Sequence, residues 1–224
     1  MRISHIALTL PLLVVALAPV AACDLDPVHA SLVSQLGPEA PGIPKGPFHR
    51  AGQPCVVCHG DDGPASVKFA VAGTVFYGPG TRTDSNGNLI PLIGAGSVNV
   101  YIEDGSGSML PAVQTNCVGN WWIKSSDLGT LQFPLLVSIS GPTLNGVQSR
   151  PMTSQIGREP SCGMCHQVQS YPNQPGAISN YYQTPGVIYL TGDDPKYQGD
   201  PATCGSGQSP VNPPFPQGLG PVSP

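Results

Sequence analysis

Two short motifs hold the residues of this chain that could do chemistry: residues 55–59 read CVVCH and residues 162–166 read CGMCH. Both follow the pattern C-x-x-C-H, which is typical of covalent attachment of a c-type haem. Two thiols at this spacing can form thioethers to the two vinyl groups of one porphyrin, and the His that follows lies against the iron as its proximal ligand. The sequence predicts two haem c groups, with thioethers to Cys55, Cys58, Cys162 and Cys165 and iron ligands His59 and His166.

Four cysteines in two C-x-x-C pairs also occur in zinc ribbons. The two pairs of a ribbon usually lie about 15–20 residues apart, whereas here a whole domain separates them. With 5 His in 224 residues, a His directly after both pairs is improbable by chance. A redox-active dithiol or a pair of disulfides would not need that His. Haem attachment is therefore the favoured interpretation, and zinc binding and thiol redox chemistry are its alternatives.

The sixth iron ligand has few candidates. His49 lies six residues before the first motif, and Met152 lies ten residues before the second, where a strand is predicted to end. An axial Met raises the potential of a haem relative to an axial His. His29, in the N-terminal segment, is a third candidate, and each of the three also has a plainer role as a loop His or a packed Met. Met109 lies beside a Gly-rich turn, and Met164 lies inside its own attachment loop, so both are poorer candidates.

The first 22 residues have the parts of a secretory signal: a positive start, an apolar run and small residues before the cleavage site. The apolar run is too short to be read as a spanning helix. Residues 20–23 (VAAC) resemble a bacterial lipobox, which predicts that Cys23 is lipidated and anchors the protein to a membrane. The alternative is ordinary cleavage that leaves Cys23 as a thiol. The two remaining cysteines, Cys117 and Cys204, are predicted to form a disulfide, because exported proteins mature in an oxidising compartment.

The composition favours β structure. Charged residues make up 10% of the chain, and 28 Gly with 27 Pro oppose a helical bundle. The net charge of −4 becomes more negative once Arg2 leaves with the signal, and no basic stripe with interleaved aromatics suggests nucleic-acid binding.

Short segments with strand-like alternation recur between Gly-rich turns, which indicates an antiparallel β-sandwich. We expect strands within residues 67–77, 97–102, 119–124, 133–140 and 146–150, and a last strand at 186–190. Trp121 and Trp122 then point to opposite faces, so that one fills the core and the other covers a haem or the outer sheet, although both could simply pack. If the strands beside the two motifs are neighbours, both haems lie at one end of the sandwich.

The predicted organisation has six parts. They are a signal peptide (1–22), a flexible Pro-rich tether with one helical turn near residues 30–36 (23–47), a first haem-binding segment (48–66), the β-sandwich (67–152), a second haem-binding segment with the final strand (153–198) and an irregular Gly/Pro-rich tail (199–224). The fold class is mainly β, an antiparallel sandwich flanked by two irregular haem-binding segments.

Residues 72–76, 96–100, 116–121 and 134–137 carry a resemblance to the carboxypeptidase regulatory-like, transthyretin-like β-sandwich. The order C-x-x-C-H-G, sandwich, R-x-M, C-x-x-C-H resembles haem-bearing lipoproteins of deltaproteobacterial type, over residues 53–191. The resemblance implies a transthyretin- or Ig-like sandwich in a dihaem cytochrome lipoprotein. Cys117, inside the turn of residues 115–119, departs from the pattern and suggests a local staple.

We expect an electron carrier in the cell envelope of a bacterium, lipid-anchored and facing the periplasm or the cell surface. Its partners would be redox proteins, with self-association possible. Two other functions stay open. One is a haem enzyme, such as a peroxidase or reductase, with one iron lacking a sixth protein ligand. The other is a structural sandwich module of a surface cytochrome assembly.

Overall fold

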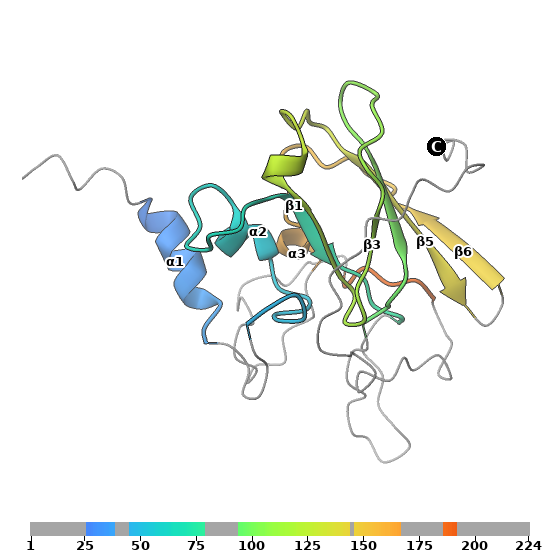
Figure 1. Cartoon of the computed structure of the whole chain (residues 1–224), viewed down its shortest axis with the longest axis horizontal. Coiled ribbons are helices and arrows are strands. Elements are labelled where there is room, and N and C mark those ends of the chain that lie inside the picture. The colour runs from blue at the N-terminus through green and yellow to red at the C-terminus, as the bar shows by residue number, and fades with distance from the viewer. Residues whose placement is uncertain (1–25, 39–44, 79–93, 144–145, 167–185, 192–224) are drawn as a thin grey trace, which may run out of the picture.

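The computed structural model describes residues 26–38, 45–78, 94–143, 146–166 and 186–191. Helical segments are α1 (Pro27–Gln35), α2 (Cys55–His59), α3 (Cys162–Cys165) and the single 3-10 turn η3 (Ser125–Asp127). The strands are β1 (Phe69–Thr74), β2 (Asn99–Glu103), β3 (Val113–Gln114), β4 (Asn120–Lys124), β5 (Leu136–Thr143) and β6 (Gly146–Pro151). Strands predominate over helices in the part of the chain described (Figure 1), so the prediction of a mainly β protein is confirmed.

The strands form two antiparallel sheets. β1 pairs with β4 in the smaller sheet, and the larger sheet has the order β3-β2-β5-β6. Trp121 and Trp122 lie opposite Gly73 and Ala72 of β1. Because successive side chains of a strand point to opposite faces, Trp121 is only 1% exposed, whereas Trp122 is half-buried and stacks on Phe69. The prediction that one of the two tryptophans fills the core is confirmed.

Both sheets contribute to one hydrophobic core. Full burial of each large aliphatic side chain stabilises the fold by about 1.5–3 kcal/mol. The core includes Cys162, which is 6% exposed, so the second C-x-x-C-H motif is packed into the body of the protein. The largest fully buried side chains of this core are Val71, Val75, Val98, Val100, Ile102, Val113, Trp121, Leu135 and Leu190.

The observed strands match the sequence pattern with two differences. β1, β2, β4, β5 and β6 fall within or close to the predicted segments, while the two-residue β3 is too short to show alternation. In place of the predicted last strand, residues 186–191 make one isolated bridge, Tyr189 to Phe76. Phe76 lies beyond the end of β1, where the strand pairing has ended. Its N–H donates a hydrogen bond to Ile188 O (2.8 Å), and its carbonyl oxygen accepts one from Leu190 N–H (2.9 Å).

α1 lies in the segment predicted to be a flexible tether, and it is longer than the single turn expected. Asp26 caps the helix by accepting a hydrogen bond from Val28 N–H (2.9 Å), and Pro27 occupies the first turn, where its missing N–H costs nothing. Leu32, Val33 and Leu36 recur at helical spacing and pack with residues of α2 and α3. Leu32 and Val33 of the helix and Leu36 at its C-terminal cap give too weak a pattern to predict this docking from the sequence.

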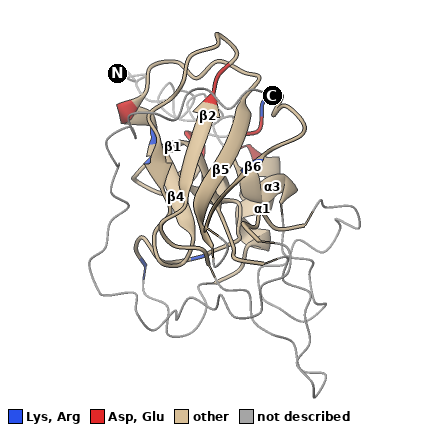
Figure 2. Ribbon diagram, turned by 90° about the vertical axis from the view of Figure 1, so that its right-hand side faces the viewer, with Lys and Arg blue, Asp and Glu red and all other residues tan. Residues whose placement is uncertain are grey.

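The described surface carries few charges, and Figure 2 shows them scattered over an otherwise uncharged ribbon. Among the residues that the structure describes, no helix is long and apolar enough to cross a membrane. The predicted signal peptide, the lipidation site Cys23 and the tail from residue 199 lie outside the described residues.

Candidate functional site

β1 brings the two C-x-x-C-H motifs together. α2 and α3 both contact this strand. Ser161, just before α3, makes a parallel bridge with Ala72, and Ala72 N–H donates to Pro160 O (3.1 Å). The N–H of Gly52, shortly before α2, donates to the hydroxyl of Thr74 (2.9 Å). The same six-residue strand therefore positions both motifs.

The two motifs also touch each other directly. The main-chain N–H of Val56 donates to Oγ of Ser161 (3.3 Å). A Cβ atom at Gly163 would lie 2.7 Å from the carbonyl oxygen of Gln53, and one at Gly73 would lie 2.8 Å from Cβ of Cys162. Glycine is required at both places for this close approach. Groups bound to the two motifs would therefore be neighbours.

The histidines of the two motifs are held in the same way. Nδ1 of His59 lies 2.8 Å from the carbonyl oxygen of Val67, and Nδ1 of His166 lies 2.9 Å from the carbonyl oxygen of Gly186. A carbonyl oxygen can only accept, so Nδ1 carries the proton in each neutral ring and Nε2 keeps its lone pair. A metal-ligating His is usually oriented by such a bond from its second nitrogen.

None of the four motif cysteines forms a disulfide among the described residues. Burial raises the pKa of the Cys55 thiol to about 11, and burial together with the neighbouring Cys55 raises the pKa of Cys162 to about 12. Both thiols thus lie in surroundings that disfavour a free thiolate. Among the described residues, no group of three or more His, Cys, Asp and Glu side chains is arranged to hold a metal ion.

Aromatic rings surround the histidine of the first motif. The ring of Phe69 stacks on His59 with centres 4.1 Å apart and an interplanar angle of 11°. Phe69 also stacks with Trp122, with ring centres 5.3 Å apart. His49 lies beside His59, with ring centres 5.9 Å apart and planes at 73°. The sequence suggested His49 as a neighbour of this motif, but it gave no sign of the stacked Phe69, because Phe69 reads as an ordinary strand residue.

Two buried side chains fix the loop that carries His49. Asn120 of β4 donates from Nδ2 to His49 O (2.9 Å) and Pro47 O (3.3 Å), and Asn116 donates to Pro47 O (2.7 Å). Asn120 Oδ1 in turn accepts from the hydroxyl of Thr74 in β1 (2.8 Å). The backbone at His49 is thus tied to both strands of the smaller sheet.

Arg50 joins the same loop to α1. Its guanidinium donates to the carbonyl oxygens of Leu36 (3.2 Å) and Gly37 (2.7 Å) and to the side chain of Gln53 (2.7 Å). These acceptors include carbonyls at the C-terminal end of α1, where the helix has none of its own donors left. Arg50 has φ of +52°, a left-handed conformation that non-glycine residues rarely adopt and that occurs often at functional sites.

The second motif borders a cavity of about 220 Å³. Cys162, Cys165 and His166 line it together with Met152, which the sequence suggested as an iron ligand, and with the Trp121 side chain. Met152 follows β6, and its main-chain N–H donates a hydrogen bond to Val137 O (2.8 Å). Most of the other lining side chains are apolar residues of β5, β6 and the segment at residues 187–189.

Two buried ring nitrogens near the motifs have no hydrogen-bond partner among the described residues: Nε2 of His29 and Nε1 of Trp121. His29 lies one turn before Leu32 and Val33 on α1, which pack with residues of both motifs. Trp121 lines the cavity of the second motif. A buried polar atom without a partner is costly, so both positions fit a bound group that the chain itself does not supply.

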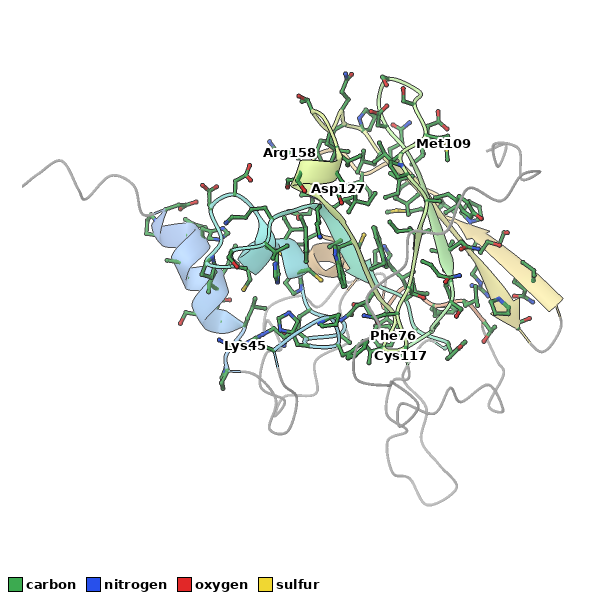
Figure 3. The ribbon with its side chains drawn as sticks, in the orientation of Figure 1. Lys45, Phe76, Met109, Cys117, Asp127 and Arg158 are labelled. Atoms are coloured by element: carbon green, nitrogen blue, oxygen red, sulfur yellow. The ribbon has the colours of Figure 1, made fainter. Side chains whose placement is uncertain are left out.

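The donor set fits haem at each motif, with two thiols on one helical turn, a His whose Nε2 is available, and an apolar surface beside it. Cys117 is disulfide-bonded, and its predicted partner Cys204 lies outside the described residues, so their pairing stays a prediction. Figure 3 shows Met109 at the opposite end of the larger sheet from Cys117, and Met109 is 40% exposed.

No protein-family model matches this chain, and neither a curated protein nor a solved structure is significantly similar to it. The resemblance to transthyretin-like sandwiches and to haem-bearing lipoproteins therefore stays a prediction.

Proposed function

We propose that this chain is a dihaem c-type cytochrome that transfers electrons in the cell envelope. The observation that carries the proposal is that the rings of both motif histidines are oriented by the same kind of hydrogen bond. His59 and His166 each bind a main-chain carbonyl through Nδ1 and so keep Nε2 for a metal. If the two C-x-x-C-H sequences had arisen by chance, the same Nδ1 hydrogen bond would not be expected at both histidines.

Each haem supplies an iron that exchanges single electrons. The four motif cysteines would hold the haems as thioethers, formed by addition of each thiol across one vinyl group, with the thiol hydrogen passing to the other vinyl carbon and no oxidant or leaving group needed. His59 and His166 would bind the iron. Cys162 and Trp121 would exclude water on the core side, and Asn120 fixes the loop of His49.

Electron transfer is favoured over enzymatic chemistry because each motif has a candidate sixth ligand in its surroundings. His49 lies beside His59, and Met152 lines the cavity of His166. With both axial positions filled, neither iron offers an open site to a substrate. The close approach of the motifs at Val56 and Ser161 also suits electron exchange between neighbouring haems.

The finer structural and cellular predictions belong to the same proposal. We propose that the two sheets form a transthyretin-like sandwich, that residues 1–22 are a signal peptide, and that a lipid on Cys23 anchors the protein in the envelope. The membrane contact then depends on the lipid, and the partners are redox proteins that dock on the weakly charged surface.

The test is haem quantification on the full chain matured in a host that attaches c-type haem. We expect two covalent haems per chain by mass and by absorption, both low-spin when oxidised. Replacing Cys55 and Cys58 by Ala should remove one haem, and replacing Cys162 and Cys165 should remove the other. The matched control, Cys117→Ala, should keep both haems.

Absence of covalent haem in the mature protein would refute the proposal and return zinc binding and thiol redox chemistry to consideration. Two haems with one high-spin, five-coordinate iron would instead favour the haem enzyme.

A further inference from the structure

We propose that the two haem sites have different sixth ligands, His49 at the first motif and Met152 at the second, so that electrons pass from the first site to the second. This inference rests on the proposed cytochrome function. It assigns the direction of internal electron flow, which the motifs alone do not give, because the two C-x-x-C-H sequences are equivalent in their chemistry.

His49 has the separation from His59 that shared ligation requires. Two imidazoles that bind one metal from opposite sides, each with a metal–nitrogen distance of about 2 Å, have ring centres about 6 Å apart. The observed separation is 5.9 Å. Rings on opposite sides of a metal can be rotated freely about the axis that joins them, so an interplanar angle of 73° is compatible with this arrangement.

Hydrogen bonds from the chain itself hold the His49 backbone. Its carbonyl oxygen accepts from Asn120, which is 5% exposed and itself bonded to Thr74. Arg50, the next residue, is bonded to Leu36 and Gly37. A ligand whose own main chain and next residue are held by hydrogen bonds loses little conformational entropy when it binds.

Met152 occupies the corresponding place at the second motif. Its side chain and that of His166 line one cavity, and its main chain is anchored to Val137 of β5. No histidine other than His166 lines that cavity among the described residues. A thioether is a soft, neutral ligand that suits an apolar site, and the neighbouring lining residues Ile139, Ile156 and Val187 are apolar.

The sixth ligand separates the potentials of the two sites. An axial Met raises the potential of a haem relative to an axial His. His59 and His166 are both half-buried, and Arg150 and Glu159 also line the cavity of His166, so the difference in ligand carries the assignment. One electron leaves the iron at the His49 site and reduces the iron at the Met152 site, so the exchange balances without another reactant.

The test is a potentiometric titration of the dihaem protein followed by absorption and low-temperature electron paramagnetic resonance. We expect two separate one-electron midpoint potentials. Met152→His should lower the upper potential toward the lower one and leave the lower one in place. Met109→Leu, a change at an exposed Met far from both motifs, should shift neither. His49→Ala should convert only the lower-potential haem to a high-spin state.

The wild-type protein provides a measurement that does not depend on any variant folding. An axial Met in a reduced low-spin haem gives a methyl proton resonance strongly shifted upfield by the porphyrin ring current, and one such resonance per chain is expected. Its absence would overturn the Met152 assignment, as would unchanged potentials in Met152→His. If His29→Ala, rather than His49→Ala, converts a haem to a high-spin state, the proposed pair of ligands is wrong.

The failures of the two proposals can be told apart. If the wild-type chain attaches no haem, the cytochrome function itself fails. If it attaches two haems that titrate at one potential and show no Met resonance, the cytochrome stands and the unequal ligation fails.

Discussion

Gly163 of the second motif faces the main chain just before the first motif, where a Cβ atom would lie 2.7 Å from the carbonyl oxygen of Gln53 and 2.9 Å from the nitrogen of Pro54. Backbone atoms cannot rotate out of the way as a flexible side chain can. The contact between the two motifs, which lie far apart in the sequence, therefore depends on a residue without a side chain.

Gly163→Ala is expected to destabilise the protein by about 1–3 kcal/mol, because the added methyl group overpacks against this backbone. Denaturant unfolding of the protein measures the change. Gly157→Ala is the matched control, since nothing lies within 4 Å of a Cβ there, and its effect should stay within about 0.5 kcal/mol. Equal stabilities for the two variants would show that the motifs are not packed as described.

Asn120→Ala removes the donors to His49 and Pro47 and leaves the Thr74 hydroxyl without its acceptor. Because these groups are buried or half-buried, the loss is expected to be about 1–3 kcal/mol. The loop of His49 should loosen, so the first haem should also gain high-spin character while the second keeps its spectrum. The comparison is Gln114→Ala, which loses a single long hydrogen bond to Asn99 (3.4 Å). A spectrum altered equally at both haems would contradict this prediction.

Arg50→Lys should release α1 from the body of the protein. A lysine ammonium cannot reach the acceptors at Leu36, Gly37 and Gln53 in the planar geometry that the guanidinium uses. Hydrogen exchange at the amides of α1 should become faster, while exchange in β5 should be unchanged. Arg158→Lys, at an exposed position, serves as the control. Unchanged protection of α1 would mean that its apolar contacts alone hold it in place.

The turn after β2 should contribute stability that depends on pH. Hydrogen bonds from the Ser106 hydroxyl and from the N–H groups of Ser106 and Ser108 hold the pKa of Asp104 below its usual value. A depressed pKa in the folded state means that this contribution is present above the unfolded pKa of about 3.9 and is lost as the pH falls through the folded value.

Asp104→Asn removes that contribution. The stability difference between the wild type and Asp104→Asn should therefore be largest near neutral pH and shrink as the pH falls below about 4. Asp127→Asn, at an exposed site, provides the comparison. A difference that stays constant from pH 7 to pH 3 would contradict the prediction.

The two C-x-x-C-H motifs could be found from the sequence because each is complete within five residues. The strands could be predicted as well, because alternation between turns is a local signal. The tether prediction missed the extent of α1, whose stability comes from packing on Val57 and from Arg50 rather than from its own sequence.

From the sequence, both motifs lie at one end of the sandwich if the strands beside them are neighbours, and this condition is not met. β1 and β6, the strands next to the motifs, belong to different sheets. The motifs meet because the chain after Met152 returns to pair Ser161 with Ala72 of β1. The residues that allow this return, Gly73 and Gly163, carry no sequence pattern of their own, and the cavity beside His166 is assembled from segments distant in the chain.

Because α2 and α3 both contact β1, local opening of that strand would disturb both C-x-x-C-H motifs at once. If the proposed haems are bound through thioethers, they cannot dissociate, so such an opening would be recorded as simultaneous loss of iron ligation at both. The pair would then behave as a single cooperative unit, and a spectroscopic titration of either haem would report the integrity of the same strand.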